Sequence, residues 1–256
     1  MAQIDSNFHS MPHKAGQDKG WAERLREAEA WVKQWPEELG EARSIQDDLR
    51  WQVVCRDGYR GPDLIAGVDV GYDTKRGVAK AAVAVLATRD LRLVEAATAE
   101  ESIRFPYIPG YLSFREIPSV VKALRHLENP PDMFLCDGQG VAHPRGLGLA
   151  SHLGVILDMP SVGAAKSKLV GDHDSVGEEK GCREWLYRKG ERVGQVLRSR
   201  TRVKPIYVSC GHLVGQASAG DIVLAMTTKY RLPEPTRRAH VLTRWNTDFS
   251  SEINGV

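Results

Sequence analysis

The stretch that decides the fold is residues 133–171, MFLCDGQGVAHPRGLGLASHLGVILDMPSVGAAKSKLVG. It opens with a short apolar run, residues 133–136, which is long enough for a buried strand and ends at Asp137 and a Gly-Gln-Gly turn. Towards its end, residues 161–165 predict a second buried strand, and Lys166 follows directly. Two short apolar runs bounded by turn residues are typical of strands that are buried on both faces of a sheet.

A helix is predicted between these two strands. Pro144 fits its first turn, where the missing N–H of proline is no loss, and Pro160 ends it. Five residues recur at helical spacing, and the small ones allow close packing on a sheet: Leu147, Ala150, Ser151, Gly154 and Leu157. Strand, helix and strand in this order predict parallel strands with a right-handed crossover. Asp137 and Lys166 then emerge at the carboxyl ends of neighbouring strands, where open α/β sheets place ligands.

Three more strands are predicted upstream. Residues 64–73, LIAGVDVGYD, are apolar and β-branched, and Asp69 is expected at the end of this buried strand. A carboxylate there is unfavourable unless it is paired or binds a cation. Residues 80–88 and 91–99 are further strands joined by a short Arg-Asp turn, which predicts an antiparallel meander.

The remaining chain completes the predicted organisation. Residues 1–20 are polar and aperiodic and are expected to be a disordered extension, followed by a single domain at residues 21–256. Further helices are predicted from Trp21, Pro36, Gly215 and Pro235, with a hairpin in residues 183–204 and a strand at 205–212. With a helix before residue 133, the central order is β-β-β-α-β-α-β, an α/β arrangement.

Composition excludes several classes of protein. The 256 residues are 42% hydrophobic and 27% charged with a net charge of +2, which is ordinary for a globular protein and does not by itself indicate a nucleic-acid partner. No apolar run approaches the roughly 20 residues of a membrane span, and the amino terminus has no apolar signal core. The four cysteines have no zinc-binding spacing. We therefore expect a cytoplasmic protein in a reducing compartment.

The predicted strand order brings two carboxylates together. A meander whose first strand carries Asp69, followed by a fourth strand that ends at Asp137, is the skeleton of a ribonuclease H-like nuclease. Strands one and four are neighbours in that mixed sheet, which helices flank. Two carboxylates so close would repel each other, and a hard divalent cation such as Mg²⁺ resolves the repulsion through oxygen ligation. The alternative role of both residues is to cap a helix or turn.

Glu116 has two interpretations that the residues alone leave open. Residues 113–116, Ser-Phe-Arg-Glu, have the form of a capping box, which is a structural role. A helix capped at Ser113 would carry Pro118 beyond its first turn, where the ring meets a carbonyl and a hydrogen bond is lost. A helix that starts at Pro118 avoids this conflict and leaves Glu116 free to point into a site.

Other polar and aromatic residues also have alternatives. His143 lies close to the Gly-Gln-Gly turn and Lys166 lies at a strand end, which favours a site role, whereas spacing indicates nothing for His240. Tyr107, flanked by prolines, belongs either to an ordinary loop or to a rigid wedge that unstacks a duplex. Residues 183–204 hold six Arg and two Lys against two Glu, either as a charged hairpin face or as phosphate contacts.

The motifs as a set resemble the endonuclease V family, deoxyinosine-directed nucleases of nucleic-acid repair. The matching segments are GVDVGYD, PYIPGYLSFRE, DGQGVAHPRGLGLASHLG, VGAAKSKLVG, and PIYVSCGH with RLPEPTRRAH, which span about residues 64–245. The second and third are specific, whereas GVDVG also occurs in sugar-kinase-like folds. The resemblance implies a ribonuclease H-like fold and metal-dependent cleavage, by Mg²⁺ with Mn²⁺ as a substitute.

The resemblance also implies a substrate and a product. The substrate would be DNA with a deaminated base, with inosine-containing RNA as a further partner. Cleavage would fall on the 3′ side of the deaminated base, one phosphodiester beyond it, and leave a 3′-hydroxyl and a 5′-phosphate. The enzyme is expected to act as a monomer in DNA repair.

Roles for individual residues follow from the same resemblance. The catalytic set would be Asp69, Glu116, Asp137, His143, Lys166 and His240. Asp69 and Asp137 would hold the metal, with Glu116 also at the metal site, which favours catalysis over capping for Glu116. His240 would lie beside the metal as a second-metal or water partner. Lys166 would face the scissile phosphate or its attacking water, with His143 nearby.

Base recognition would fall on a second set. Tyr107 would be the wedge that fills the gap left by an extruded base. The hypoxanthine pocket would be lined by Gly110, Leu112, Gly138, Ala165 and Leu169. Two positions depart from the family pattern, because Cys210 stands in place of Pro and Gly215 in place of Ser. Glycine still caps a helix tolerably, so only local stability is affected at Gly215.

Three other functions compete with this one. Another ribonuclease H-like nuclease, such as a junction resolvase, would share the acidic set. A sugar-kinase-like phosphotransferase would need a second nucleotide-binding half and Gly-rich phosphate loops, which the sequence does not contain. A non-catalytic nucleic-acid-binding module would have a degenerate site, and the intact acidic set argues against it.

Overall fold

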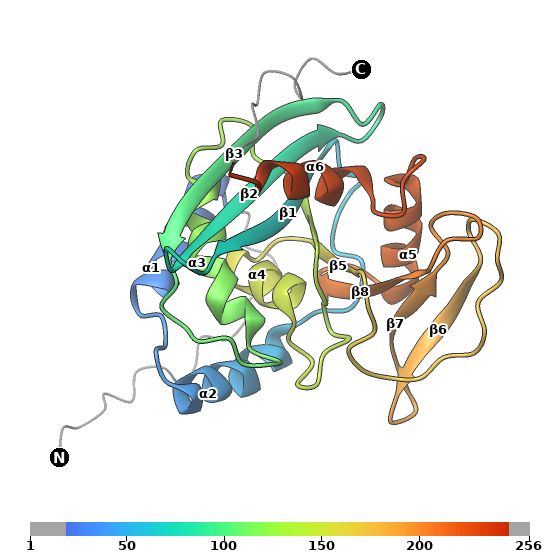
Figure 1. Ribbon diagram of the computed structural model, residues 1–256, viewed down its shortest axis with the longest axis horizontal. Helices are drawn as coiled ribbons and strands as arrows, with labels where there is room; N and C mark the ends of the chain where they lie inside the picture. The colour runs from blue at the N-terminus through green and yellow to red at the C-terminus, as the bar shows by residue number, and fades with distance from the viewer. Residues whose placement is uncertain (1–18, 246–256) are drawn as a thin grey trace.

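An eight-stranded mixed sheet forms the centre of the molecule (Figure 1). The computed structural model describes residues 19–245. The strands are β1 (Leu64–Asp73), β2 (Val78–Ala87), β3 (Leu93–Ser102), β4 (Met133–Cys136), β5 (Ser161–Ala165), β6 (Arg183–Arg188), β7 (Glu191–Leu197) and β8 (Ile206–His212). Their spatial order is β3-β2-β1-β4-β5-β8-β7-β6. The pairs β1–β4 and β4–β5 are parallel, and the other pairs are antiparallel.

Helices cover both faces of this sheet. They are α1 (Trp21–Lys33), α2 (Leu39–Leu49), the 3₁₀ turn η1 (Arg50–Gln52), α3 (Leu112–Leu124), α4 (Leu149–Leu157), α5 (Gln216–Ala225) and α6 (Glu234–Leu242). Helices α1 to α4 share one apolar core with the sheet, while α5 and α6 pack on the opposite face. The predicted ribonuclease H-like mixed α/β sheet, with its meander and parallel crossover, is confirmed.

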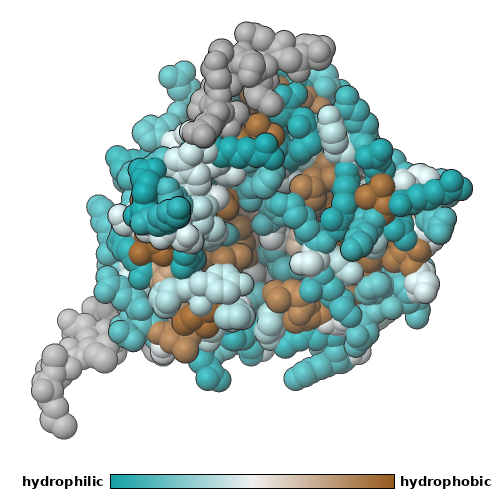
Figure 2. All heavy atoms as spheres, viewed as in Figure 1, coloured by the Kyte–Doolittle hydropathy of each residue, from teal (hydrophilic) through white to brown (hydrophobic). Residues whose placement is uncertain are grey.

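The surface carries no single large apolar area on the face that Figure 2 shows. Hydrophobic residues there form separate small patches among hydrophilic ones. Exposed large hydrophobic side chains occur singly on several elements and loops, including Trp51, Tyr107 and Leu169. Scattered exposed hydrophobic residues are normal for globular proteins. No helix among residues 19–245 is both long and apolar enough to cross a membrane.

Residues 133–171 fold as predicted at their two strands, but their helix starts later than predicted. The bounds of β4 and β5 match the predicted runs, whereas α4 begins only at Leu149, so Pro144 lies in the preceding loop and not in a first helical turn. The loop packs closely on β8, because a Cβ on Gly140 would lie 1.9 Å from the Cys210 carbonyl oxygen. The helix ends at Leu157, before Pro160, with Asp158 in a left-handed conformation (φ 48°).

Helix α3 contradicts both predicted starts. It runs through Pro118, and Ser113 makes no capping bond. Pro118 has no N–H to donate to the Phe114 carbonyl, one turn earlier. The indole N–H of Trp35 donates to that carbonyl instead, at 2.6 Å. A residue 79 positions away therefore compensates for the proline, and Glu116 is placed inside the helix.

The carboxyl end of β1 differs from the prediction, whereas the start of α5 agrees with it. Strand β1 continues to Asp73, so Asp69 is not at a strand end as predicted but lies where the shorter neighbour β4 stops. Gly215 is the N-cap residue of α5, as expected, and Asp57 accepts its N–H at 2.7 Å. The predicted disorder of residues 1–20 falls outside the described residues except at its last two positions, and the single domain stays a prediction.

Candidate active site

The backbone brings Asp69 and Asp137 side by side. The last paired residues of the parallel strands β1 and β4 are Val68 and Cys136, and the two aspartates come directly after them. The Asp137 N–H donates to the Val68 carbonyl at 2.9 Å, which extends the pairing by one residue. The short strand β4 therefore ends where β1 presents Asp69, so both carboxylates lie at one edge of the sheet.

His240 of α6 completes a compact group of ligand atoms. Its Nδ1 lies 2.7 Å from Asp69 Oδ2. One ligand atom from each of Asp69, Asp137 and His240 lies within 4.8 Å of the other two. Helix α6 can approach β1 closely because Gly67 has no side chain: a Cβ there would lie 1.9 Å from the Pro235 carbonyl oxygen.

The charges in this group oppose one another. Burial, and then the nearby Asp137 carboxylate, raise the pKa of Asp69 to about 6, against the hydrogen bond from His240. Lys166, at the end of β5, forms an ion pair with Asp137. The ammonium group thus supplies positive charge at the place where the two carboxylates converge, and the predicted meeting of Asp137 and Lys166 at one sheet edge is what the structure contains.

Glu116 lies near this group but outside it. Its Oε1 accepts the hydroxyl of Tyr72 at 2.9 Å, and the guanidinium of Arg115 lies 4.8 Å from the centre of the Tyr72 ring. Its Oε2 is buried and has no hydrogen-bond partner among the described residues. Burial, reinforced by Asp69 and Asp137 and opposed by the Tyr72 hydrogen bond, raises the pKa of Glu116 to about 8.

These residues fit a hard divalent cation. Two carboxylates within reach of each other and a third carboxyl group with a free buried oxygen are an oxygen-rich donor set, which suits Mg²⁺ or Mn²⁺. Carboxyl groups whose pKa is raised by burial and by each other gain from a positive charge placed between them. Imidazole suits Mn²⁺ better than Mg²⁺, so His240 fits a role as a water partner when Mg²⁺ is bound.

The loop after Asp137 connects to the loop that carries Tyr107. The Nδ1 of buried His143 accepts the Arg145 N–H at 3.2 Å, and burial lowers the pKa of His143 to about 4. Arg145 donates to the Gly110 carbonyl at 2.6 Å and also contacts Gln46 of α2. His143 is therefore a neutral residue that supports the contact between the Arg145 loop and the Gly110 loop. It lies beside Gly110 and is not part of the group formed by Asp69, Asp137 and His240.

The residues predicted to bind a base are divided between separate segments. Gly138 and Ala165 lie at the ends of the parallel strands, close to the aspartates, and Ala165 is buried. Tyr107 is 71% exposed, and Leu112 and Leu169 are also exposed, which leaves all three side chains available to a ligand. Gly110 has φ +82° and presents its carbonyl to Arg145. That these residues gather round one base stays a prediction.

The arginine-rich segment, residues 183–204, was predicted to be either a charged hairpin face or a set of phosphate contacts, and neither describes it completely. Arg188 donates to the His143 carbonyl at 3.2 Å, and Arg198 donates to the Gly177 carbonyl at 2.9 Å. Arg183 forms an ion pair with Asp221 at 2.7 Å. These three guanidinium groups hold loops and helix α5 in place, so the density of arginine here indicates an internal framework as well as surface charge.

Sequence reasoning missed three supporting residues. Tyr72 holds Glu116, Gln46 reaches the Gly110 carbonyl at 3.0 Å, and Trp35 completes α3. Tyr72 could have been found, because it lies in the GVDVGYD motif three positions after Asp69. Gln46 and Trp35 gave no signal, since their partners are distant in the sequence.

Comparison with known proteins identifies the family. The sequence profile of the family Endonuclease V matches residues 47–241. Endonuclease V of Nostoc punctiforme is 51% identical over 209 residues, which cover 81% of this chain and 95% of that protein. Endonuclease V of Rippkaea orientalis is 53% identical over 207 residues, covering 81% and 90%. The chain belongs to the endonuclease V family.

Solved endonuclease V structures share the fold. That of the Streptomyces avermitilis protein has a TM-score of 0.79 and 45% identity, covering 82% of this chain and 93% of that one. Endonuclease V of Ciona intestinalis, in complex with a 24mer DNA containing an inosine followed by a ribo-adenosine, has a TM-score of 0.71 and 28% identity, covering 80% and 95%. All six predicted catalytic residues lie inside the endonuclease V profile match, whereas α1 precedes it.

Proposed function

We propose that this endonuclease V family member is a Mg²⁺-dependent endonuclease, with Mn²⁺ as a substitute, that repairs DNA containing deaminated bases such as inosine. It would hydrolyse the second phosphodiester on the 3′ side of the base and leave a 3′-hydroxyl and a 5′-phosphate. The observation that carries the proposal is the convergence of Asp69, Asp137 and His240 at one sheet edge. The inosine-containing DNA held by the Ciona relative supports the choice of substrate.

The acidic residues would organise the reacting groups. Asp69 and Asp137 would hold the cation, which stabilises charge on the phosphate and favours ionisation of a water. Glu116, oriented by Tyr72, would hold a water or a further metal position through its free Oε2. The imidazole of His240, fixed by Asp69, would accept a hydrogen bond from the attacking water.

Lys166 would act on the substrate. Its ammonium is paired with Asp137 and its side chain is partly exposed. With a cation held by Asp69 and Asp137, Lys166 would be free to contact the scissile phosphate or its water. This exchange of partners would place a second positive charge at the atom where negative charge develops.

The exposed loop residues would select the base. Tyr107 would fill the gap left by the extruded nucleotide, whose unstacking is easier at a mismatched lesion. Gly110, Leu112, Gly138, Ala165 and Leu169 would line the pocket for hypoxanthine. The junction of Arg145 with the Gly110 carbonyl would keep the Tyr107 loop at a constant distance from Asp137.

Cleavage of an end-labelled inosine-containing strand tests the metal-dependent chemistry. Asp137→Asn should lower the rate in Mg²⁺ on the order of 10³-fold, because several kcal/mol of charge stabilisation are lost. Asp132→Asn is the matched control, since Asp132 lies at the opposite, amino-terminal end of β4 and should retain activity. Undiminished cleavage by Asp137→Asn would refute the assignment. If the wild-type protein cleaves four-way junctions in preference to the inosine-containing strand, a junction resolvase is favoured. If the wild-type protein cleaves neither, a non-catalytic binding module is favoured.

Binding of the same strand tests the wedge. Tyr107→Ala should weaken binding of inosine-containing DNA by roughly 10- to 100-fold, the range expected for one lost base-stacking contact. Metal affinity should stay unchanged, because Tyr107 is exposed and is not among the residues whose ligand atoms converge with the aspartates. Equal binding by both proteins would refute the wedge. Parallel assays on matched DNA and RNA strands would decide between the two substrates.

A further inference from the structure

Two cysteines with no role in the proposed chemistry lie on segments that contact each other. Cys55 belongs to the connector between η1 and β1, and Cys210 belongs to β8. Cys55 is exposed, whereas Cys210 is fully buried. The interaction between the two thiols lowers the pKa of Cys55 and raises that of Cys210. The Cys210 Sγ also lies 3.8 Å from the carbonyl oxygen of Val54, the residue before Cys55.

The connector is held on both sides of Cys55. The Val54 N–H donates to His212 Nδ1 at 3.3 Å, and Asp57 accepts the Gly215 N–H at 2.7 Å. Both partners lie at or just beyond the end of β8. Because the backbone is anchored before and after Cys55, its thiol stays next to Cys210 without any large rearrangement of the chain.

We propose that Cys55 and Cys210 form a redox-active pair that closes to a disulfide when the protein meets a hydroperoxide such as H₂O₂. The Cys55 thiolate would attack the peroxide, forming an S–O bond and breaking the O–O bond, and the released hydroxide would take a proton to become water. The Cys210 thiol would then attack Cys55 Sγ, forming the S–S bond and expelling the oxygen as a second water. Two thiols are oxidised and one peroxide is reduced by two electrons.

The asymmetry of the pair assigns these roles. Cys55 is the thiol that an oxidant in solvent can reach. The hydrogen bond with Cys210 lowers the pKa of Cys55, because it stabilises the thiolate. The same interaction, and then burial, raise the pKa of Cys210, so its thiol stays protonated. Cys55 is therefore the attacking thiol and Cys210 the resolving one.

The disulfide would tie the connector to a strand that supports the site. The Cys210 carbonyl accepts the Val141 N–H at 2.8 Å, and Ser209 Oγ accepts the Gly140 N–H at 2.9 Å, so this part of β8 holds the loop after Asp137. A covalent ring from residue 55 to residue 210 restricts the unfolded chain. We expect the thermal unfolding midpoint to rise by about 5 °C on oxidation.

Thiol counting on the full-length chain tests the proposal and does not depend on nuclease activity. The reduced protein, alkylated with N-ethylmaleimide after denaturation, should carry an adduct on each of its four cysteines. After exposure of the native protein to H₂O₂, adducts on Cys55 and Cys210 should both be missing. Peptide mapping should show these two residues linked, and dithiothreitol should restore all adducts.

Matched variants make the result specific. Cys55→Ser, at an exposed position, should keep every remaining thiol alkylated and its unfolding midpoint unchanged by H₂O₂, whereas Cys182→Ser should behave as the wild type. Any of four results would overturn the proposed disulfide. These are full alkylation after oxidation, a disulfide to Cys182, a disulfide between two molecules, and irreversible oxidation of Cys55 alone. Equal midpoints for oxidised and reduced wild type would overturn the stabilising effect.

Discussion

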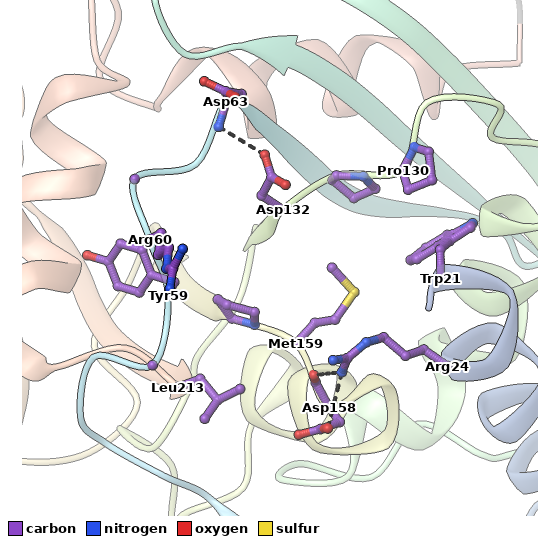
Figure 3. A pocket seen from close by; sticks show the side chains of 14 residues that line it. Trp21, Arg24, Tyr59, Arg60, Asp63, Pro130, Asp132, Asp158, Met159 and Leu213 are labelled. Carbon is purple, nitrogen blue, oxygen red and sulfur yellow. Dashed lines mark hydrogen bonds and ion pairs between the residues drawn. The ribbon is translucent and has the colours of Figure 1, made fainter. Parts of the chain in front are cut away.

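The two ends of the parallel strands use acidic residues in opposite ways. At the amino ends, two acids have partners: Asp132 accepts the N–H groups of Asp63 and Leu64, both at 2.9 Å, and Asp158 pairs with Arg24 of α1 at 3.2 Å. Figure 3 shows the contacts with Asp63 and Arg24. At the carboxyl ends, the ligand atoms of Asp69 and Asp137 converge, and the ammonium group of Lys166 is paired with Asp137. The amino end is arranged for stability and the carboxyl end for binding positive charge.

The cavity described below does not mark the reactive end of the strands, whereas the pKa shifts of the acidic residues do. A cavity of about 390 Å³ lies at the amino end, between α1, the connector before β1 and the turn after α4, as Figure 3 shows. Asp132 and Asp158, two of the acids that line it, already have hydrogen-bond or ion-pair partners. The carboxyl end instead holds groups with raised pKa values, Asp69 and Glu116. Perturbed ionisation indicates the reactive end better than volume does.

Asp69→Asn should separate activity from stability more strongly than any other substitution, lowering the first and raising the second. We expect the cleavage rate in Mg²⁺ to fall on the order of 10³-fold. Without metal, the same variant should be more stable than the wild type at pH 7.5 by about 1 kcal/mol, because a carboxyl group with a pKa of about 6 no longer has to ionise beside Asp137. Cleavage assays and urea unfolding with EDTA measure the two effects. If the variant is both less active and less stable than the wild type, Asp69 has a structural role and not the proposed metal-binding one.

Glu116→Gln should change how stability depends on pH. The folded-state pKa of Glu116, about 8, lies above its ordinary value of 4.5, so the folded state binds the proton more tightly. Its contribution is full below pH 4.5 and is lost as the pH rises through 8, on the order of 5 kcal/mol. Urea unfolding of the metal-free protein from pH 5.5 to 8.5 should show a decline that Glu116→Gln reduces. Saturating Mg²⁺ should also reduce it, because the cation favours the ionised form.

An unchanged slope in Glu116→Gln would place the titrating group elsewhere. Glu95 is the matched control: backbone N–H bonds from residues 128 and 129 lower its pKa. Glu95→Gln should leave the decline between pH 5.5 and 8.5 intact, since its carboxyl group is already ionised throughout that range.

Arg24→Ala should affect stability alone. Arg24 donates to the Leu157 carbonyl at 3.1 Å and to the Asp158 carbonyl, both at the end of α4. Loss of these charge-assisted bonds should lower the free energy of unfolding by about 2 kcal/mol. The cleavage rate, measured well below the unfolding temperature, should stay within twofold. A large loss of activity would show that the two ends of the sheet are coupled.

Asp132→Ala should give the smallest effect. Asp132 is exposed, and its two bonds tie the start of β1 to the start of β4. We expect a loss of about 1 kcal/mol in the free energy of unfolding, by denaturant titration, with unchanged cleavage. Asp132→Asn should lose less, because its side-chain oxygen still accepts hydrogen bonds. A greater loss in Asp132→Asn than in Asp132→Ala would contradict the proposed contacts.

Local patterns determined much of this protein. The apolar runs at residues 133–136 and 161–165 predicted β4 and β5 at their observed bounds, because a strand buried on both faces needs continuous apolar residues. The strand order then predicted that Asp69 and Asp137 would be neighbours. These features depend on short-range pattern and on chain handedness, which the sequence contains directly.

Tertiary structure decided the remainder of the site. His240 reaches Asp69 from 171 residues away because α6 packs on Gly67 of β1. Helix α3 continues through Pro118 because the distant indole of Trp35 bonds the Phe114 carbonyl, so Glu116 points from a helix that local rules would have broken. In both cases a partner far along the chain alters the energy of a local conformation. Only the folded molecule shows that partner.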